Sequence, residues 1–469
     1  MTSSHRSLAW SERPLRELLR LGWPITVSLL SFGVMTLVDT LFVSTIGTSA
    51  LAGVGLAGTA TFVLYCFSFG LLRGTKVLVS QAIGAGRREE LGAHLGAALA
   101  TALVLGVATA IVGHFVAHVL PFLGASEQAG RDAETYLDIR TLGAPIVLSF
   151  VALREYRYGE SDTRSPMVAG VLGNLANIAL NAWLVLVLHW GVRGSAIATL
   201  LGHSVELCVV ALAQSRHGFP IGRARVRHVT ALFQIGAPTG VQFLLEMGSF
   251  ALLTAIVSSM GETQMAAHQI ALQVIHFSFL PTVAIAEAAS VLAGQAVGAD
   301  RDELVMRVAK SGLLAVTVYT GLWTLLLAFA GPLLVSGFTA FAEVGEPEVA
   351  SAALMLLYVA ASFQLADGAA TIARGVLRGA GDVRVPARLG VLCAWLTTPP
   401  SAYLLGRVMG LGALGGWIGL SVEIIVLAAL CWRRLARGDW RPLAEKARAE
   451  LEMAHGAGLE GVAADASAG

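Results

Sequence analysis

The chain has 469 residues, of which 55% are hydrophobic and only 13% charged, and its mean hydropathy is +0.71. Soluble domains carry about 25% charged residues, so this composition excludes an ordinary soluble protein and indicates an all-α integral membrane protein. The net charge of +1 offers no field that would attract nucleic acid.

Twelve apolar segments are long enough to cross a hydrocarbon core of about 30 Å. They are predicted at residues 19–44, 50–75, 92–120, 137–157, 166–188, 195–215, 229–258, 264–294, 306–335, 349–377, 386–406 and 411–432. Lys and Arg gather in alternate connections, whereas the opposite side holds only Arg131, Arg193 and Arg407, and Arg140 falls inside a span. Because basic residues mark cytoplasmic loops, we expect a multi-pass inner (plasma) membrane protein with both termini cytoplasmic.

The chain contains an internal repeat. "LGWP" at 21–24 matches "IGAP" at 235–238, and "QAIGAGR" at 81–87 matches "QAVGADR" at 295–301, both at the same offset. "GESDTRSP" at 159–166 matches "GAGDVRVP" at 379–386 at an offset larger by six, and the six extra residues are placed in a loop over 333–348. The repeat predicts two parallel six-helix lobes, with a cleft between them suited to alternating access.

These boundaries predict five regions. They are a cytoplasmic N-terminus (1–18), an N-lobe (19–215), a cytoplasmic linker (216–228), a C-lobe (229–432) and a cytoplasmic tail (433–469) formed by a short helix and a partly disordered end.

Three carboxylates are predicted well inside spans: Asp39, Glu246 and Asp367. An acid at a helix centre costs about 2.5–3.5 kcal/mol on insertion, and such acids commonly mark an ion or proton path. Each lies on a polar helical stripe, and Gln242 and Gln364, which are candidate residues of the substrate or ion path, belong to two of these stripes. A purely structural role stays open, because each acid could be neutral or paired with a buried basic residue.

Other residues of the sequence give weaker evidence of a functional role. Glu287 is a possible member of the ion path, or a packing or interface residue. The histidines and the four cysteines lack the spacing of metal ligands, and the loops "GAGR" and "GADR" lack the Lys-Ser/Thr of a P-loop. An integral-membrane enzyme would need a cluster of catalytic residues, and none is evident in the sequence. We therefore expect no enzyme activity, no metal and no cofactor.

The motifs together resemble those of the multidrug and toxic compound extrusion (MATE) family, from Leu21 to about Trp432. The resemblance rests on Pro24 in the first helix, "LVDTLFVSTIGTSALAGVG", the paired "QAIGAGR" and "QAVGADR" loops, "GESDTRSP" followed by "NIALNAWLV", and "FQLADGAATIARGVLRGAGDVRVP". It implies a V-shaped antiporter with twelve helices, which exchanges cationic or amphiphilic drugs for Na⁺ or H⁺ and is expected to act as a monomer.

The resemblance also implies roles for individual residues. Asp39 lies where the family has its first-helix acid, and Pro24 where it has a proline linked to bending of that helix. Glu246 and Asp367 lie at the cation-binding pair of the NorM-like branch, which this sequence resembles more than the DinF-like branch.

The N-lobe polar site departs from the DinF-like pattern. Asn177 and Thr199 match it, whereas Asn181 replaces an acid, and Phe363 replaces a tyrosine that NorM-like members often carry near the C-lobe acids. Asp39 is then the sole charged candidate of the N-lobe, and hard cations prefer carboxylate oxygens. Protonation of Asp39 is therefore favoured over tight Na⁺ binding there. A lipid-linked oligosaccharide flippase of the same superfamily is the alternative, and a cavity lined by several Arg or Lys would favour it.

Overall fold

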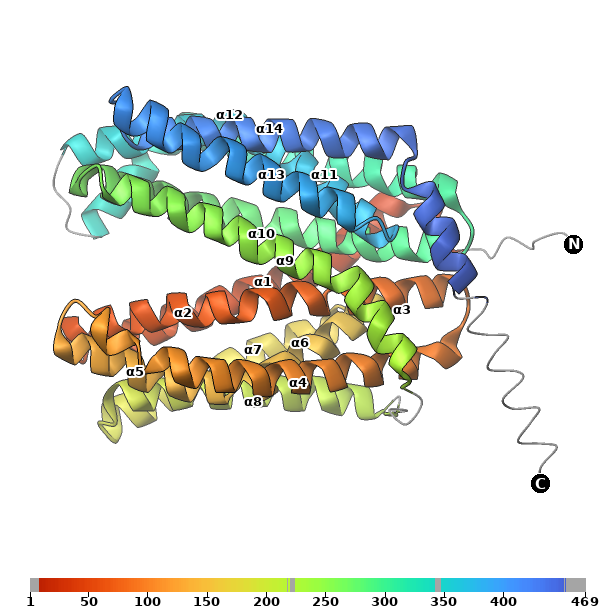
Figure 1. The fold of residues 1–469 in the computed structure, drawn as a ribbon, viewed down its shortest axis with the longest axis horizontal. Coiled ribbons are helices and arrows are strands. Elements are labelled where there is room, and N and C mark those ends of the chain that lie inside the picture. The colour runs from red at the N-terminus through yellow and green to blue at the C-terminus, as the bar shows by residue number, and fades with distance from the viewer. Residues whose placement is uncertain (1–7, 217, 220–223, 342–346, 451, 453–469) are drawn as a thin grey trace, which may run out of the picture. The chain divides into compact units, whose positions relative to one another are not determined.

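The computed structural model describes residues 8–216, 218–219, 224–341, 347–450 and 452, and all regular structure in these ranges is helical (Figure 1). The first half contains α1 (Pro14–Ser44), α2 (Thr48–Leu72), α3 (Gly74–Gly84), α4 (Leu91–Ala117), α5 (Glu127–Leu142), α6 (Ala144–Gly159), α7 (Arg164–Asn181) and α8 (Gly191–Ser215). The second half contains α9 (Val226–Ser258), α10 (Glu262–Gly298), α11 (Asp302–Phe341), α12 (Pro347–Gly379), α13 (Arg384–Ser401) and α14 (Ala413–Arg437). Short 3₁₀ segments, η1 (Arg88–Glu90) and η2 (Leu120–Phe122), and π-helical segments, η3 (Ala182–Val187) and η5 (Ala402–Val408), complete it.

The predicted membrane fold is confirmed. In the described residues, ten helices are long and apolar enough to cross a membrane, and the α5–α6 pair, bent by 49°, makes an eleventh. The segment formed by α13 and η5 occupies the predicted span 386–406 without meeting that criterion. Many apolar side chains face outward, among them Val104 at 69% and Phe329 at 84% exposure. Lipid, unlike water, solvates such a surface without cost.

Three sequence expectations were wrong in detail. The fourth span was predicted to begin at 137, but α5 begins at Glu127, where the Oγ of Ser126 accepts a hydrogen bond from the Ala129 amide at 3.1 Å. This helix is too polar for a hydropathy pattern to show. The predicted connection between the spans 50–75 and 92–120 is largely the helix α3, and Lys76 within it is buried. The predicted loop 333–348 is helical to Phe341, and residues 342–346 lie outside the described part of the chain.

The chain forms two compact units. Among the described residues, unit 1 contains those within 1–22, 80–88 and 245–469, and unit 2 contains those within 23–79 and 89–244. The change of unit in the second half falls inside α9, after Leu244, while the lobe boundary at 216–228 stays a prediction. In the tail, residues 441–450 are helical and Arg448 pairs with Asp302 at 2.8 Å, whereas the disorder predicted at the very end falls on residues outside the description.

The backbone repeats the conformations that the sequence repeat predicts. Gly86 and Asp300, which the repeated "QAIGAGR" and "QAVGADR" loops make equivalent, have φ values of +69° and +58°. Ser161 and Gly381, which the second pair of motifs makes equivalent, have φ values of +63° and +86°. The π-helical segments η3 and η5 begin at the offset of this second pair. Since left-handed backbone is uncommon outside glycine, its recurrence at Asp300 and Ser161 supports a duplication rather than a chance match of letters.

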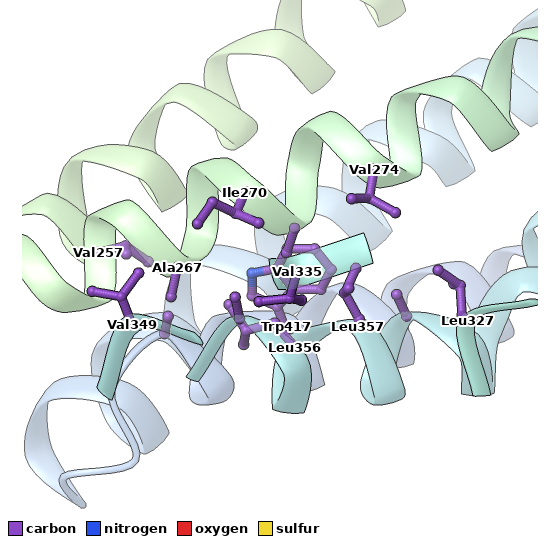
Figure 2. Close-up of a cluster of buried hydrophobic side chains, with 14 of the residues drawn as sticks. Val257, Ala267, Ile270, Val274, Leu327, Val335, Val349, Leu356, Leu357 and Trp417 are labelled. Atoms are coloured by element: carbon purple, nitrogen blue, oxygen red, sulfur yellow. The ribbon is translucent and has the colours of Figure 1, made fainter. Parts of the chain in front are cut away.

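The core of unit 1 gathers apolar side chains from α9, α10, α11, α12 and α14 around the fully buried indole of Trp417 (Figure 2). The Nε1–H of Trp417 donates to Nδ1 of the buried His268 at 3.0 Å. This bond gives α14 a fixed register against α10, because an indole N–H inside an apolar core has few other partners.

We expect Trp417→Phe to lower the free energy of unfolding by about 1–3 kcal/mol, because the buried His268 loses its donor. Thermal unfolding in detergent measures the change. Trp395→Phe is the matched control, since that residue is 40% exposed and its indole donates to a backbone carbonyl. An equal loss in both variants would contradict the role given to the Trp417–His268 bond.

Candidate functional site

A polar site surrounds Asp39 near the end of α1 in unit 2, and this residue is only 3% exposed. Its Oδ1 accepts from the side-chain amides of Asn177 at 3.0 Å and Asn181 at 2.9 Å. Its Oδ2 accepts from the hydroxyls of Thr199 at 2.5 Å and Tyr136 at 3.2 Å. A carboxylate has about four lone-pair sites, so this one is saturated with donors.

The positions of these donors follow from the spacing of the residues along their helices. Asn174, Asn177 and Asn181 are three and four residues apart, so they share one face of α7. The amide of Asn174 donates to the carbonyl of Ser31 at 2.9 Å, which fastens α7 to α1 about two helix turns before Asp39. Thr199 reaches the same point from α8, and Tyr136 from α5. Four helices thus converge on one carboxylate.

The site borders a cavity of about 450 Å³ inside unit 2. Aromatic side chains form much of its wall: Phe32, Phe62, Tyr65, Phe69 and Tyr136. Asp39, Arg140 and His203 add polar or charged groups to that wall. A mostly apolar pocket with a few oriented polar groups is the usual form of a small-molecule site.

Two amide oxygens beside Asp39 are unused. The Oδ1 atoms of Asn177 and Asn181 are buried and have no hydrogen-bond partner among the described residues. A flip of either amide group about its Cβ–Cγ bond would turn its oxygen toward Asp39, and that oxygen could accept a hydrogen bond from a protonated carboxyl. The site can therefore satisfy Asp39 with or without a proton.

The predicted C-lobe acids lie in unit 1. Glu246 of α9 pairs with Arg374 of α12 at 3.3 Å, and both side chains are about three-quarters buried. Asp367, about two helix turns before Arg374, is half-buried and lies within electrostatic range of it. A further acid, Glu423 of α14, accepts from Thr398 at 2.5 Å and interacts electrostatically with all three charged groups. Arg374 therefore interacts electrostatically with all three carboxylates.

The remaining predicted residues fall in different surroundings. Gln364 donates to the hydroxyl of Ser278 at 2.9 Å, deep in unit 1. Glu287 is 4% exposed and pairs with Arg378 at 3.0 Å, which fits the packing role that the sequence left open. Gln242 is half-buried on α9, and Pro24 is buried within the continuous helix α1.

The sequence interpretation gave no functional role to several charged groups inside spans. The expectation that Asp39 is the sole charged candidate of its lobe was wrong, because Arg140 and the His203–Glu206 pair, joined at 2.7 Å, lie in the same unit. Glu423 was missed as well. A scan of every span for ionisable residues finds all of them, and the three-residue spacing of His203 and Glu206 already places both on one helix face.

Comparisons with known proteins identify the family of the chain. The family model MatE matches residues 24–183 and again 238–404, so its two matches begin at the offset of the first repeat motifs. A probable multidrug resistance protein NorM of Pseudomonas syringae pv. tomato is 31% identical over 430 residues, which cover 88% of this chain and 92% of the relative. The protein of the same name from Bradyrhizobium diazoefficiens is 32% identical over 454 residues, which cover 90% and 93%.

The fold is shared with solved transporters. The outward-facing structure of a multidrug resistance MATE family transporter of the MOP superfamily matches with a TM-score of 0.84 at 22% identity, over 93% of this chain and 99% of that one. The fold defines a multi-pass helical membrane protein. By the family model and its NorM relatives, the chain belongs to the MATE family of multidrug efflux transporters, as the sequence motifs predicted.

Proposed function

We propose that this protein is a secondary active antiporter that exports organic cations or amphiphilic drugs in exchange for H⁺ or Na⁺ by alternating access. The observation that supports this most is the buried, donor-saturated carboxylate of Asp39 at the wall of an aromatic cavity. A proton, a metal cation and a cationic drug would all be attracted by the negative charge of Asp39. Competition between them provides coupling, because each ligand shifts the equilibrium by its differential affinity for the two states.

We propose that Asp39 binds a proton rather than Na⁺. The four groups that contact it all donate hydrogen bonds to it, and the residue that could have supplied a second carboxylate is Asn181. Hard cations prefer several oxygen ligands, with carboxylates foremost. A proton needs only one acceptor to turn toward the carboxyl, and the unused amide oxygens of Asn177 and Asn181 offer two.

The acids of unit 1 form the second part of the proposed coupling machinery. Glu246 and Asp367 share Arg374 with Glu423, so acids outnumber the basic side chain in this group. Like charges close together in a medium of low dielectric favour uptake of a proton or another cation. We assign Glu423 to this group beside the two acids predicted from the sequence.

The proposal places the protein in the inner (plasma) membrane as a monomer, with both termini cytoplasmic, in keeping with the distribution of its basic residues. The flippase alternative gains no support from the cavity of unit 2, since Arg140 is the one Lys or Arg among the described residues of its wall. Several basic residues would be needed to hold a pyrophosphate-linked lipid.

The test is transport by purified protein in proteoliposomes, with (1-naphthylmethyl)trimethylammonium as a fluorescent cationic probe. A pH gradient or a Na⁺ gradient is imposed alone, with the membrane potential clamped. We expect the pH gradient to drive accumulation that collapses with a protonophore. Failure of both gradients to drive accumulation would contradict the antiport proposal. Accumulation driven by the Na⁺ gradient alone would contradict the assignment of H⁺ as the coupling ion.

A further inference from the structure

Arg140 is a basic residue inside a predicted span, and the coupling proposal does not use it. It lies near the end of α5, just before the 49° bend to α6, and it lines the cavity of unit 2. An arginine at membrane depth costs about 2.5–3.5 kcal/mol on insertion scales, and such residues usually face a cavity or pair with an acid. The insertion cost of Arg140 suggests that this residue has a function in the aromatic cavity.

No acid neutralises Arg140 in the part of unit 2 that the structure describes. Among these residues its guanidinium makes no ion pair, and its Nε is buried without a hydrogen-bond partner. The guanidinium lies over the ring of Tyr136, whose centroid is 5.9 Å from Cζ. The hydroxyl of Tyr65 donates to the backbone carbonyl of Arg140 at 3.3 Å, which holds the main chain and leaves the guanidinium unused.

Asp39, the carboxylate that lines the same cavity, already accepts four hydrogen bonds from other residues. Tyr136 stands between the two charges: its hydroxyl donates to Asp39 and its ring faces Arg140. The cavity wall therefore carries one saturated anion and one arginine with unused donors. A planar guanidinium with unused N–H groups matches a carboxylate in shape and charge.

We propose that Arg140 is a binding residue for the carboxylate of aromatic acids and zwitterions, whose rings pack against the aromatic wall of the cavity. This inference rests on the proposed transport function and names a substrate class for the same cavity. A zwitterion would place its anionic group on Arg140 and its cationic group toward Asp39, with Tyr136 between them. An aromatic acid would use Arg140 alone.

The two charges then act oppositely on ligands of opposite charge. Loss of the Arg140 charge weakens binding of an aromatic carboxylate and leaves or strengthens binding of an aromatic cation. Loss of the Asp39 charge, by protonation or in Asp39→Asn, does the reverse, since a negative charge that repels the carboxylate disappears. A merely structural arginine would affect both ligands equally.

Binding to the purified protein in detergent, without any ion gradient, tests this separately from transport. The probes are 1-naphthylacetate, its neutral amide 1-naphthylacetamide, and (1-naphthylmethyl)trimethylammonium, each followed by naphthyl fluorescence. We expect the wild-type protein to prefer the carboxylate over the amide by about tenfold or more, the value of a charge-assisted hydrogen bond. Arg140→Gln should abolish this preference and leave the affinity for the cation within about threefold.

Arg131→Gln is the matched control, because Arg131 lies on the same helix, pairs with Glu127 and has a side chain that is 56% exposed. Equal binding of acid and amide by the wild-type protein overturns the inference whether or not any variant folds. An equal loss for acid and cation in Arg140→Gln also overturns it. Displacement of the acid by added phosphatidylglycerol would assign Arg140 to a lipid headgroup instead, and would overturn the substrate class.

Discussion

Replacing Asp39 by asparagine is expected to lower pH-driven efflux of the cationic probe by at least about tenfold, because asparagine neither takes up a proton nor attracts the probe by a negative charge, and about 1.4 kcal/mol corresponds to tenfold. The fold should persist, since asparagine retains an oxygen for the amides of Asn177 and Asn181. Its own amide can donate to the hydroxyl oxygens of Tyr136 and Thr199. Efflux from proteoliposomes under a fixed pH gradient measures the effect.

Asp138→Asn is the control for this variant. Asp138 is an acid of the same unit, but its side chain is 48% exposed, it pairs with His114, and it is absent from the cavity wall. We expect it to retain most of the wild-type rate. Intact efflux in both Asp39→Asn and Glu246→Gln would show that neither carboxylate couples transport to the gradient.

Lys76→Met is expected to lower the free energy of unfolding by about 3–5 kcal/mol, as removal of one partner of a buried ion pair does. The Nζ of Lys76 lies 2.7 Å from Oε2 of Glu155, and the two side chains are 1% and 3% exposed. Arg154 also contacts Glu155, at 3.0 Å, which places this variant toward the lower end of the range. Thermal unfolding in detergent measures the loss.

The double variant Lys76→Met/Glu155→Gln should recover part of that loss, because it leaves no buried carboxylate without its lysine. Lys446→Met serves as the surface control. That lysine pairs with Glu450 at 3.7 Å with both side chains largely exposed, so its loss should cost no more than about 1 kcal/mol. If Lys76→Met and Lys446→Met cost the same, the buried pair does not stabilise unit 2.

Most of the fold could be predicted from the sequence, because lipid imposes one strong rule, that long apolar segments become helices. The rule provided little information where a helix is polar or buried in protein. The helix α5 contains Glu127, Arg131 and other charged residues, so its start was missed. Lys76 looked like a loop residue, since a sequence does not show that Glu155, on a different helix, lies close enough to neutralise it.

The candidate site was predicted in its parts and not in its arrangement. Asp39, Asn177, Asn181 and Thr199 were named, and the structure brings them together. Tyr136 was not, because a tyrosine in a polar helix has no distinctive spacing. Glu246 and Asp367 lie near one arginine, and that Arg374 pairs with Glu246 rather than with Asp367 depends on side-chain geometry.

Proton movement caused by the substrate tests the central claim most directly. Proteoliposomes are prepared at equal pH and equal Na⁺ on both sides and loaded with the cationic probe, and a pH dye records the lumen while the probe leaves. Exchange of drug for protons at Asp39 predicts lumen acidification in the wild-type protein and none in Asp39→Asn. Probe efflux without acidification in the wild-type protein, or with equal acidification in Asp39→Asn, would contradict it.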